Sequence, residues 1–238
     1  MIHFYHVTKK FDRQSVALQD VSFQVEKGDF VFVTGASGAG KSTLLKLILR
    51  QIRPSDGQII VNGRNLATMK RSQLPYFRRE IGMVFQDFKL IERMTVFENL
   101  AFILTVLGVP PREHKQRVLN ALRAVNLHAK LNSYPLQLSG GEQQRIAIAR
   151  ALINDPMIVI ADEPTGNLDP DLSREIMQIF IDANLRGSTM IVATHDRELI
   201  RMAGKRVMVL DKGRVQEEKA PVIEAPLSRD RTPFLNWN

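Results

Sequence analysis

Gly35-Ala36-Ser37-Gly38-Ala39-Gly40-Lys41-Ser42-Thr43 is the segment that decides the fold of this chain. It follows the apolar run at residues 30–33 and precedes residues 44–49, whose leucines have helical spacing. A strand, a loop with the spacing G-x-x-x-x-G-K-S and a helix, in that order, are typical of a phosphate-binding P-loop. Glycines let successive backbone N–H groups point at phosphate oxygens, and the start of the helix adds its positive end. A merely flexible Gly/Ser loop would not need the strand before it or the helix after it, so the sequence predicts nucleotide binding.

Two side chains of this loop have expected roles at a phosphate. Lys41 can reach the β- and γ-phosphates as a point charge, and the Ser42 hydroxyl can bind Mg²⁺.

Size and composition limit the remaining possibilities. A chain of 238 residues, 44% hydrophobic and 24% charged, fits one large α/β domain or a core with a smaller insertion. The absence of cysteine excludes disulfides, thiolate nucleophiles and cysteine metal sites, and is compatible with a reducing cytosol. The longest apolar run, residues 100–109, is about half the length needed to cross a bilayer. We expect no membrane span in this chain, so any membrane role would come through a partner.

The formal charge of +8 has two functional interpretations, nucleic-acid binding and attraction to an acidic membrane or partner. A generally basic surface is the simpler alternative. Lysines and arginines are spread along the chain, and no dense basic run contains interleaved aromatic residues. We therefore expect no nucleic-acid partner.

The first part of the chain reads as strands around the P-loop. Residues 21–25 alternate apolar and polar, as in an antiparallel strand with one wet face, and residues 58–61 form a strand that ends at an Asn-Gly turn. Phe11 lies between an expected strand at residues 2–7 and the strand at residues 21–25, where it could stack on a purine or pack at a sheet edge. Gln86 follows a strand at residues 81–85 and could reach both Mg²⁺ and a water molecule, although a lone loop glutamine is usually nothing more.

Helical periodicity without an intervening strand then runs over residues 95–134, broken at Pro110 and Pro111. This pattern predicts a helical insertion at about 87–153 in an α/β core made of residues 1–86 and 154–218. Ser139 with Glu142 three residues later forms a capping box, which starts a new helix. The bare, capped helix start is either an ordinary cap or a second anion site that completes the pocket of a second copy.

Two further strands end in polar residues. The apolar run at residues 157–161 leads to Asp162 and Glu163, a pair suited to Mg²⁺ binding and to polarising water respectively. Another apolar strand, at residues 190–193, precedes His195, a candidate γ-phosphate sensor or a structural histidine. Residues 206–216 read as a hairpin. The tail at 219–238 has no periodicity and reads as disordered or as a docking peptide.

Taken in order, six motifs resemble those of the ATPase subunits of ABC systems: the P-loop, Gln86, residues 138–145 (LSGGEQQR), residues 158–163 (IVIADE), residues 167–169 (NLD) and His195. The resemblance covers residues 1–217. It implies an α/β fold with a P-loop NTPase core, an antiparallel β subdomain and an inserted α-helical subdomain, the ABC nucleotide-binding domain. It also implies a homodimer that closes head to tail on two ATP molecules.

The same resemblance implies a role for each candidate residue. The residues expected to bind nucleotide are Phe11, which would stack on adenine, the P-loop from Gly35 to Thr43, and Ser139, Gly140 and Gly141 of the other copy. Those expected to bind Mg²⁺ are Ser42, Gln86 and Asp162, the last through water. Those expected to act in catalysis are Glu163 as the carboxylate, His195 as the switch residue, Gln86 and Lys41. Asn167 stands where many importers have alanine.

Within the family, ADEPTGNLD and the P-loop flanks resemble most closely the bacterial cell-division ATPases. That likeness implies a cytoplasmic protein held at the inner membrane by an integral membrane partner, with other division proteins nearby. Lipoprotein-releasing and macrolide-exporting ATPases share nearly all of these motifs. A soluble ABC protein acting on nucleic acid or ribosomes, and a nucleotide-sensing scaffold without useful turnover, are the alternatives from other classes.

Overall fold

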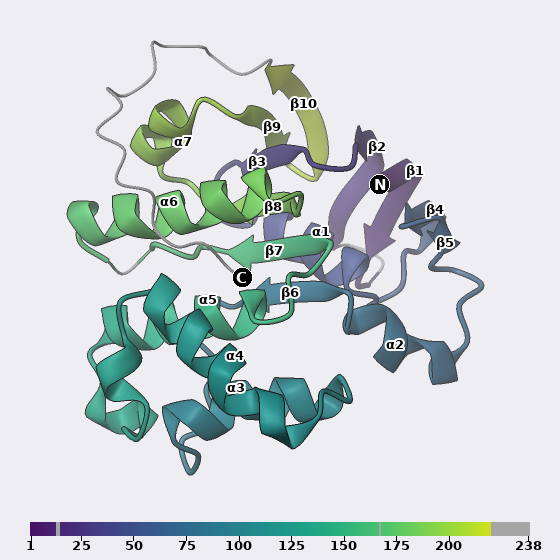
Figure 1. Ribbon diagram of the computed structural model, residues 1–238. Coiled ribbons are helices and arrows are strands. Elements are labelled where there is room, and N and C mark those ends of the chain that lie inside the picture. Colours follow the sequence, from purple (N-terminus) through teal and green to yellow (C-terminus); the bar gives the residue numbers. More distant parts are fainter. Residues whose placement is uncertain (13–14, 167, 220–238) are drawn as a thin grey trace.

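The computed structural model describes residues 1–12, 15–166 and 168–219 and is shown in Figure 1. The predicted tail and Asn167 lie outside the described residues, apart from Lys219, the last residue of a strand. The strands are β1 (Ile2–Lys10), β2 (Val16–Val25), β3 (Phe30–Thr34), β4 (Asp56–Val61), β5 (Arg64–Asn65), β6 (Ile81–Val84), β7 (Ile158–Asp162), β8 (Thr189–Ala193), β9 (Arg206–Asp211) and β10 (Arg214–Lys219). The α-helices are α1 (Lys41–Ile48), α2 (Leu74–Arg78), α3 (Val96–Val106), α4 (Pro111–Ala124), α5 (Gly140–Leu152), α6 (Pro170–Leu185) and α7 (Arg197–Ala203). None of the helices in this part of the chain is long and apolar enough to span a bilayer.

Two sheets form the β structure. The six-stranded sheet has the order β10-β9-β3-β8-β7-β6, in which β10 is antiparallel and the other five strands are parallel. The four-stranded sheet has the order β2-β1-β4-β5 and is antiparallel throughout. The α/β core with an antiparallel β part, expected from the sequence, is confirmed.

Alternate residues of the parallel strands pack into two different cores. Val31 and Val33 of β3 join the apolar cluster that contains α1 and the four-stranded sheet, so α1 lies between the two sheets. Phe30 and Phe32 face the opposite side and pack with residues of α6 and α7. Because neighbouring strand residues point to opposite faces, strands buried on both faces must be apolar at every position. This explains the unbroken apolar runs in the sequence.

A third apolar cluster is formed by α3, α4 and α5 and lies below the six-stranded sheet in Figure 1. The predicted break at the two prolines is present, since α3 ends at Val106 and α4 begins at Pro111. Helix α5 also contributes Ile148 to the cluster in which Phe30 and Phe32 pack with α6 and α7. We propose that residues 87–153 are the inserted helical subdomain, with α5 joining it to the core.

Helix α7 was not predicted from the sequence. It is a helix of 7 residues whose N-cap, Asp196, accepts hydrogen bonds from the backbone of Glu198 and Leu199. Its apolar positions are too few to show a period, so only the cap could have indicated it. The predicted hairpin at 206–216 is present as β9 and β10, and β10 continues three residues further.

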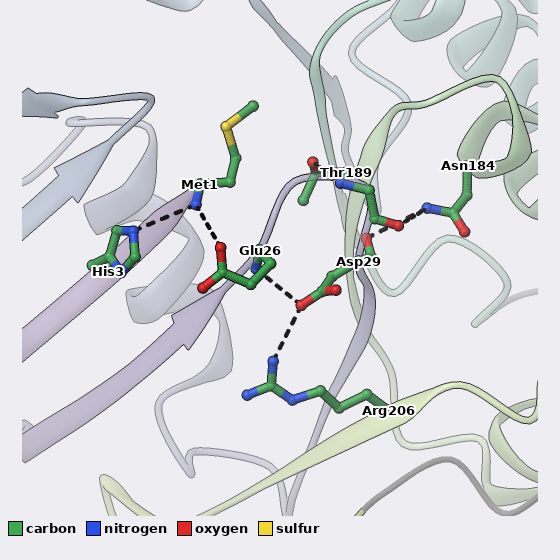
Figure 2. Close-up of polar contacts among 8 residues, drawn as sticks. Met1, His3, Glu26, Asp29, Asn184, Thr189 and Arg206 are labelled. Atoms are coloured by element: carbon green, nitrogen blue, oxygen red, sulfur yellow. Dashed lines mark hydrogen bonds and ion pairs between the residues drawn. The ribbon is translucent and has the colours of Figure 1, made fainter.

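Polar contacts tie together the amino ends of β3, β8 and β9, as Figure 2 shows. The Asp29 carboxylate accepts from the backbone N–H of Glu26 at 2.9 Å and from Arg206 at 3.3 Å. Asn184, near the end of α6, donates to the backbone carbonyl oxygens of Gly28 and Ser188, both at 2.8 Å. These contacts fix the start of β3 relative to the starts of β8 and β9. The P-loop follows the other end of β3.

Replacing Asn184 by alanine is expected to lower the free energy of unfolding by about 1 kcal/mol, because two carbonyl groups lose their donor. Urea denaturation measures this. Gln178→Ala is the matched control on the same helix, since the Gln178 amide donates to the exposed Asp182 carboxylate at 2.7 Å. The control is expected to cost less than about 0.5 kcal/mol. Equal losses in the two variants would contradict a role for Asn184 in joining α6 to β3.

Candidate nucleotide site

Four loops with polar residues meet at one edge of the six-stranded sheet. The P-loop follows β3, Gln86 follows β6, Asp162 and Glu163 lie at the end of β7, and His195 follows β8. These four strands are parallel and consecutive in the order β3-β8-β7-β6. The carboxyl ends of neighbouring parallel strands lie on the same edge, which is where open α/β sheets bind ligands.

Two glycines of the P-loop are required by their surroundings. Gly40 is the N-cap of α1 and has φ of +110°, a conformation that other residues rarely adopt. A Cβ on Gly40 would lie 2.6 Å from the carbonyl oxygen of Ala17 in β2. A Cβ on Gly35 would collide with the carbonyl group of Leu210 in β9. The loop is therefore pressed against backbone from both sheets, and its remaining open side is the nucleotide side.

Lys41 begins α1 and lies over the loop. Its Nζ donates to the carbonyl oxygens of Gly35 at 2.7 Å and Ala36 at 3.2 Å. A phosphate group in the loop would offer stronger, charged acceptors to the same ammonium group. The next residue, Ser42, donates through its hydroxyl to Asp162 Oδ1 at 3.4 Å. The hydroxyl and the carboxylate therefore face one another beside the loop.

The pKa of Asp162 is raised, chiefly because burial disfavours the charged carboxylate. The hydrogen bond from Ser42 and the charges of Lys46 and Lys41 oppose this rise, and the negative charge of Glu163 adds to it. A folded-state pKa above the unfolded value means that the folded protein binds this proton more tightly. Stability from this group is therefore present at low pH and is lost as the pH rises through the raised pKa. A cation bound at the site would favour the charged carboxylate and so reduce this loss of stability.

Glu163 is held from two directions. Its φ is +47°, in the left-handed region, and its backbone N–H donates to the carbonyl of Ala193 in the neighbouring strand at 2.9 Å. Its carboxylate oxygens both lie 3.0 Å from Nδ1 of His195, so this nitrogen carries the hydrogen and donates it. The Glu163 side chain is 13% exposed and the His195 side chain 72%. The carboxylate is thus oriented at the floor of the site, with the imidazole at its rim.

These residues line a hollow of about 590 Å³. The predicted residues among its lining are Gly35, Ala36, Ser37, Gly38, Gly40, Lys41, Ser42, Thr43, Gln86, Asp162, Glu163 and His195. Ala17 and Gly166 also line the hollow but were not predicted from the sequence. Ala17 comes from the other sheet, and nothing in its neighbouring residues indicates that position. Gly166 lies in the motif that continues from Glu163, so its proximity to the acids was the one available signal.

Other predicted residues are outside this lining. Ala39 is buried, and its carbonyl accepts from the backbone N–H of Gly213. Phe11 is 58% exposed in the turn between β1 and β2, with the Lys9 ammonium 5.1 Å from its ring centre. Ser139, Gly140 and Gly141 are at the start of α5, away from the hollow. The structure therefore assembles the P-loop side of the predicted site and leaves the other predicted phosphate contacts elsewhere on the chain.

The start of α5 has the predicted capping box. The Ser139 hydroxyl accepts from the backbone N–H of Glu142 at 3.2 Å, and the Glu142 carboxylate accepts from that of Ser139 at 2.9 Å. The backbone hydrogen bond from Ser139 lowers the pKa of Glu142, with a smaller contribution from Lys130 in the same direction. A Cβ on Gly141 would collide with Leu172 of α6. Both hydrogen bonds of the cap are made within the chain, and Gly141 packs against α6.

Known proteins share this arrangement. The ABC transporter family matches residues 18–166. The cell-division ATP-binding protein FtsE of Bacillus subtilis is 48% identical over 92% of this chain and 96% of its own length, and that of Escherichia coli K12 is 46% identical over 90% and 96%. Among solved structures, the dimeric post-hydrolysis state of the ATP-binding cassette MJ0796 bound to ADP and Pi has a TM-score of 0.85 at 36% identity, covering 92% of this chain and 98% of that one.

The family match, the identities along nearly the whole chain and the assembled P-loop site agree. The chain belongs to the ABC transporter family, and it is an ATPase of that family that is similar to FtsE along nearly its whole length.

Proposed function

We propose that this ATPase drives a bacterial cell-division complex, in which it works with an integral membrane partner of the FtsX type. Closure of the ATPase on ATP would be transmitted through that partner to activate peptidoglycan hydrolases outside the membrane, and no substrate need cross. The protein would then be held at the cytoplasmic face of the inner membrane by its partner. The observation that carries this proposal is the 46–48% identity to FtsE proteins along 90–92% of the chain.

Hydrolysis would be performed by the residues at the carboxyl edge of the sheet. Glu163 accepts a hydrogen bond from the attacking water and orients it towards the terminal phosphate. His195 holds the Glu163 carboxylate through Nδ1, so the acceptor oxygens keep one orientation. Lys41 leaves its two carbonyl contacts and neutralises negative charge on the phosphates. The Gly35–Thr43 backbone supplies the N–H groups that fix the phosphates in line.

The residues present fit Mg²⁺. Ser42 and Asp162 already face one another, Gln86 lines the same hollow, and Asp162 would act through water. The described chain contains no cluster of three or more His, Asp or Glu that could hold a metal by itself. This agrees with Mg²⁺, which protein sites bind through one or two side chains together with phosphate oxygens and water. When bound, Mg²⁺ supplies positive charge that stabilises the transferring phosphoryl group.

A homodimer would complete the nucleotide site. Ser139, Gly140 and Gly141 offer a capped helix start with no side chain beyond the serine, and they lie outside the hollow of their own chain. In a head-to-tail pair they would contact the γ-phosphate held by the P-loop of the second copy. The dimeric neighbour MJ0796 supports this arrangement.

An apolar groove next to Gln86 is the proposed docking site for the membrane partner. It has a volume of about 450 Å³ and is lined by parts of α2, α3 and α5 and by Phe85 and Lys89, which flank Gln86. Phe102 and Val106 of α3 line it and are 46% and 40% exposed. Its charged lining residues are Arg78, Arg79, Lys89 and Arg150. We therefore infer a partner segment with apolar and acidic side chains.

Cysteine cross-linking in cells tests this proposal, because the chain contains no cysteine of its own. Phe102→Cys is expected to cross-link to an FtsX-like membrane protein with four membrane spans. Leu185→Cys is the control, since Leu185 is 75% exposed at the end of α6 and outside the groove. Cross-linking to a lipoprotein-releasing or drug-exporting membrane protein instead would overturn the cell-division assignment.

A further inference from the structure

The segment after β6 contains two consecutive residues in a left-handed conformation. The angle φ is +57° at Phe88 and +52° at Lys89, a region that residues with a side chain adopt at a cost in free energy. Gln86, two residues before Phe88, lines the nucleotide hollow. A contact that holds residues 88–89 in this conformation therefore also determines where the chain places Gln86.

Arg150 of α5 makes that contact. Its Nη2 donates to the carbonyl oxygen of Phe88 at 2.7 Å and its Nη1 to that of Lys89 at 2.5 Å. The guanidinium of Arg150 is partly removed from water, and this burial lowers its pKa. Within the described residues its hydrogen bonds go to these two carbonyls. The left-handed backbone presents both carbonyls to one guanidinium, and the guanidinium in turn stabilises that backbone.

Helix α5 also lies close to the same segment at its other end, since a Cβ built on Gly140 would be 4.0 Å from Cζ of Phe88. Gly140 follows Ser139, the residue proposed to contact the nucleotide of a second copy. Ser139 and Arg150 are about 16 Å apart along the helix axis, given 1.5 Å per residue. Because a continuous helix of 13 residues moves as one body, the segment with Gln86 follows any shift of the Ser139 end.

We propose that Arg150 is a positioning residue that fixes Gln86 to helix α5. Through it, a shift of α5 at the nucleotide site of the second copy changes the position of Gln86 in the site of its own chain. The link between two copies rests on the proposed function, because it needs Ser139 to act in the second copy's site. The positioning of Gln86 by Arg150 needs only a single chain.

Arg150→Met is the first test, since methionine keeps a long apolar side chain and removes both donors. Amide hydrogen exchange of residues 85–91 in the nucleotide-free chain is expected to become faster. In the complex with the membrane partner, kcat is expected to fall by about tenfold to a hundredfold, the range for misplacement of a group near the reaction. KM for ATP is expected to stay within about twofold, because the P-loop is unaltered.

Residue 89 provides the rescue and its matched control. Lys89→Gly in the Arg150→Met background is expected to restore most of kcat and of the exchange protection, because glycine adopts positive φ without the cost of a Cβ. Lys89→Ala removes the same side chain and the same ion pair with Asp87. Alanine keeps the Cβ, so it is expected to restore neither quantity.

A purely structural role predicts that glycine and alanine behave alike, and that result would overturn the proposal. So would wild-type kcat and exchange in Arg150→Met. If Arg150→Met does not fold, Arg150→Lys, which keeps the charge and loses the paired donors, undergoes the same comparison. Failure of the proposed function appears separately, as missing cross-links from Phe102→Cys in a protein whose exchange pattern still depends on Arg150.

Discussion

Glu163→Gln binds ATP with nearly unchanged affinity and hydrolyses it about a thousandfold more slowly, which is the expected result of removing a general base while keeping its shape. The amide can still contact the Nδ1 side of His195, and residues 163–166 keep their backbone hydrogen bonds to the neighbouring strand and turn. What is lost is the negative charge that orients and polarises water. Single-turnover hydrolysis and ATP titration measure the two effects separately.

The same variant is expected to accumulate as an ATP-bound dimer, because the phosphates that bridge the two copies are no longer removed. Light scattering with and without Mg-ATP detects this. Adding Ser139→Arg to Glu163→Gln places a large side chain at the proposed contact with the second copy, so this double variant is expected to remain monomeric. A Glu163→Gln protein that turns over at the wild-type rate would reject Glu163 as the catalytic carboxylate.

Lys41→Ala is expected to weaken ATP binding by about a hundredfold or more, since charge-assisted hydrogen bonds to phosphate contribute about 1.5–3 kcal/mol each. Lys41 donates to the carbonyl groups of half-buried Gly35 and exposed Ala36, where water can replace it, so its removal should have little effect on folding. Titration with a fluorescent ATP analogue measures the affinity.

Lys115→Ala is the control for this variant. Lys115 is exposed on α4, outside the residues that line the hollow, and carries the same charge. Its removal is expected to change the ATP affinity by less than about threefold, because charges on the surface are screened. Equal effects of the two substitutions would mean that general positive charge, and not the position of Lys41, holds the nucleotide.

Local patterns in this chain were reliable guides to helix starts and to the P-loop. The capping box at Ser139 is present as predicted, and Asp169 of the NLD motif is the N-cap of α6. These features depend on side chains and backbone groups three or four residues apart, so the sequence contains all the atoms involved. Helix α7 was missed because its 7 residues are too short to establish a hydrophobic period.

The sequence by itself determined which residue types could bind phosphate, metal and water, because strand, loop and helix at the P-loop are encoded in consecutive residues. Only the tertiary structure decided that β8 pairs with β7 on one side and β3 on the other, and the β7–β8 pairing brings His195 to Glu163 across a sequence separation of 32 residues. It also placed Ala17 against Gly40 and Arg150 against residues 88–89, the latter across 61 and 62 residues. The physical reason is that parallel strands leave no local signal of their neighbours or register, which are chosen by the packing of whole faces.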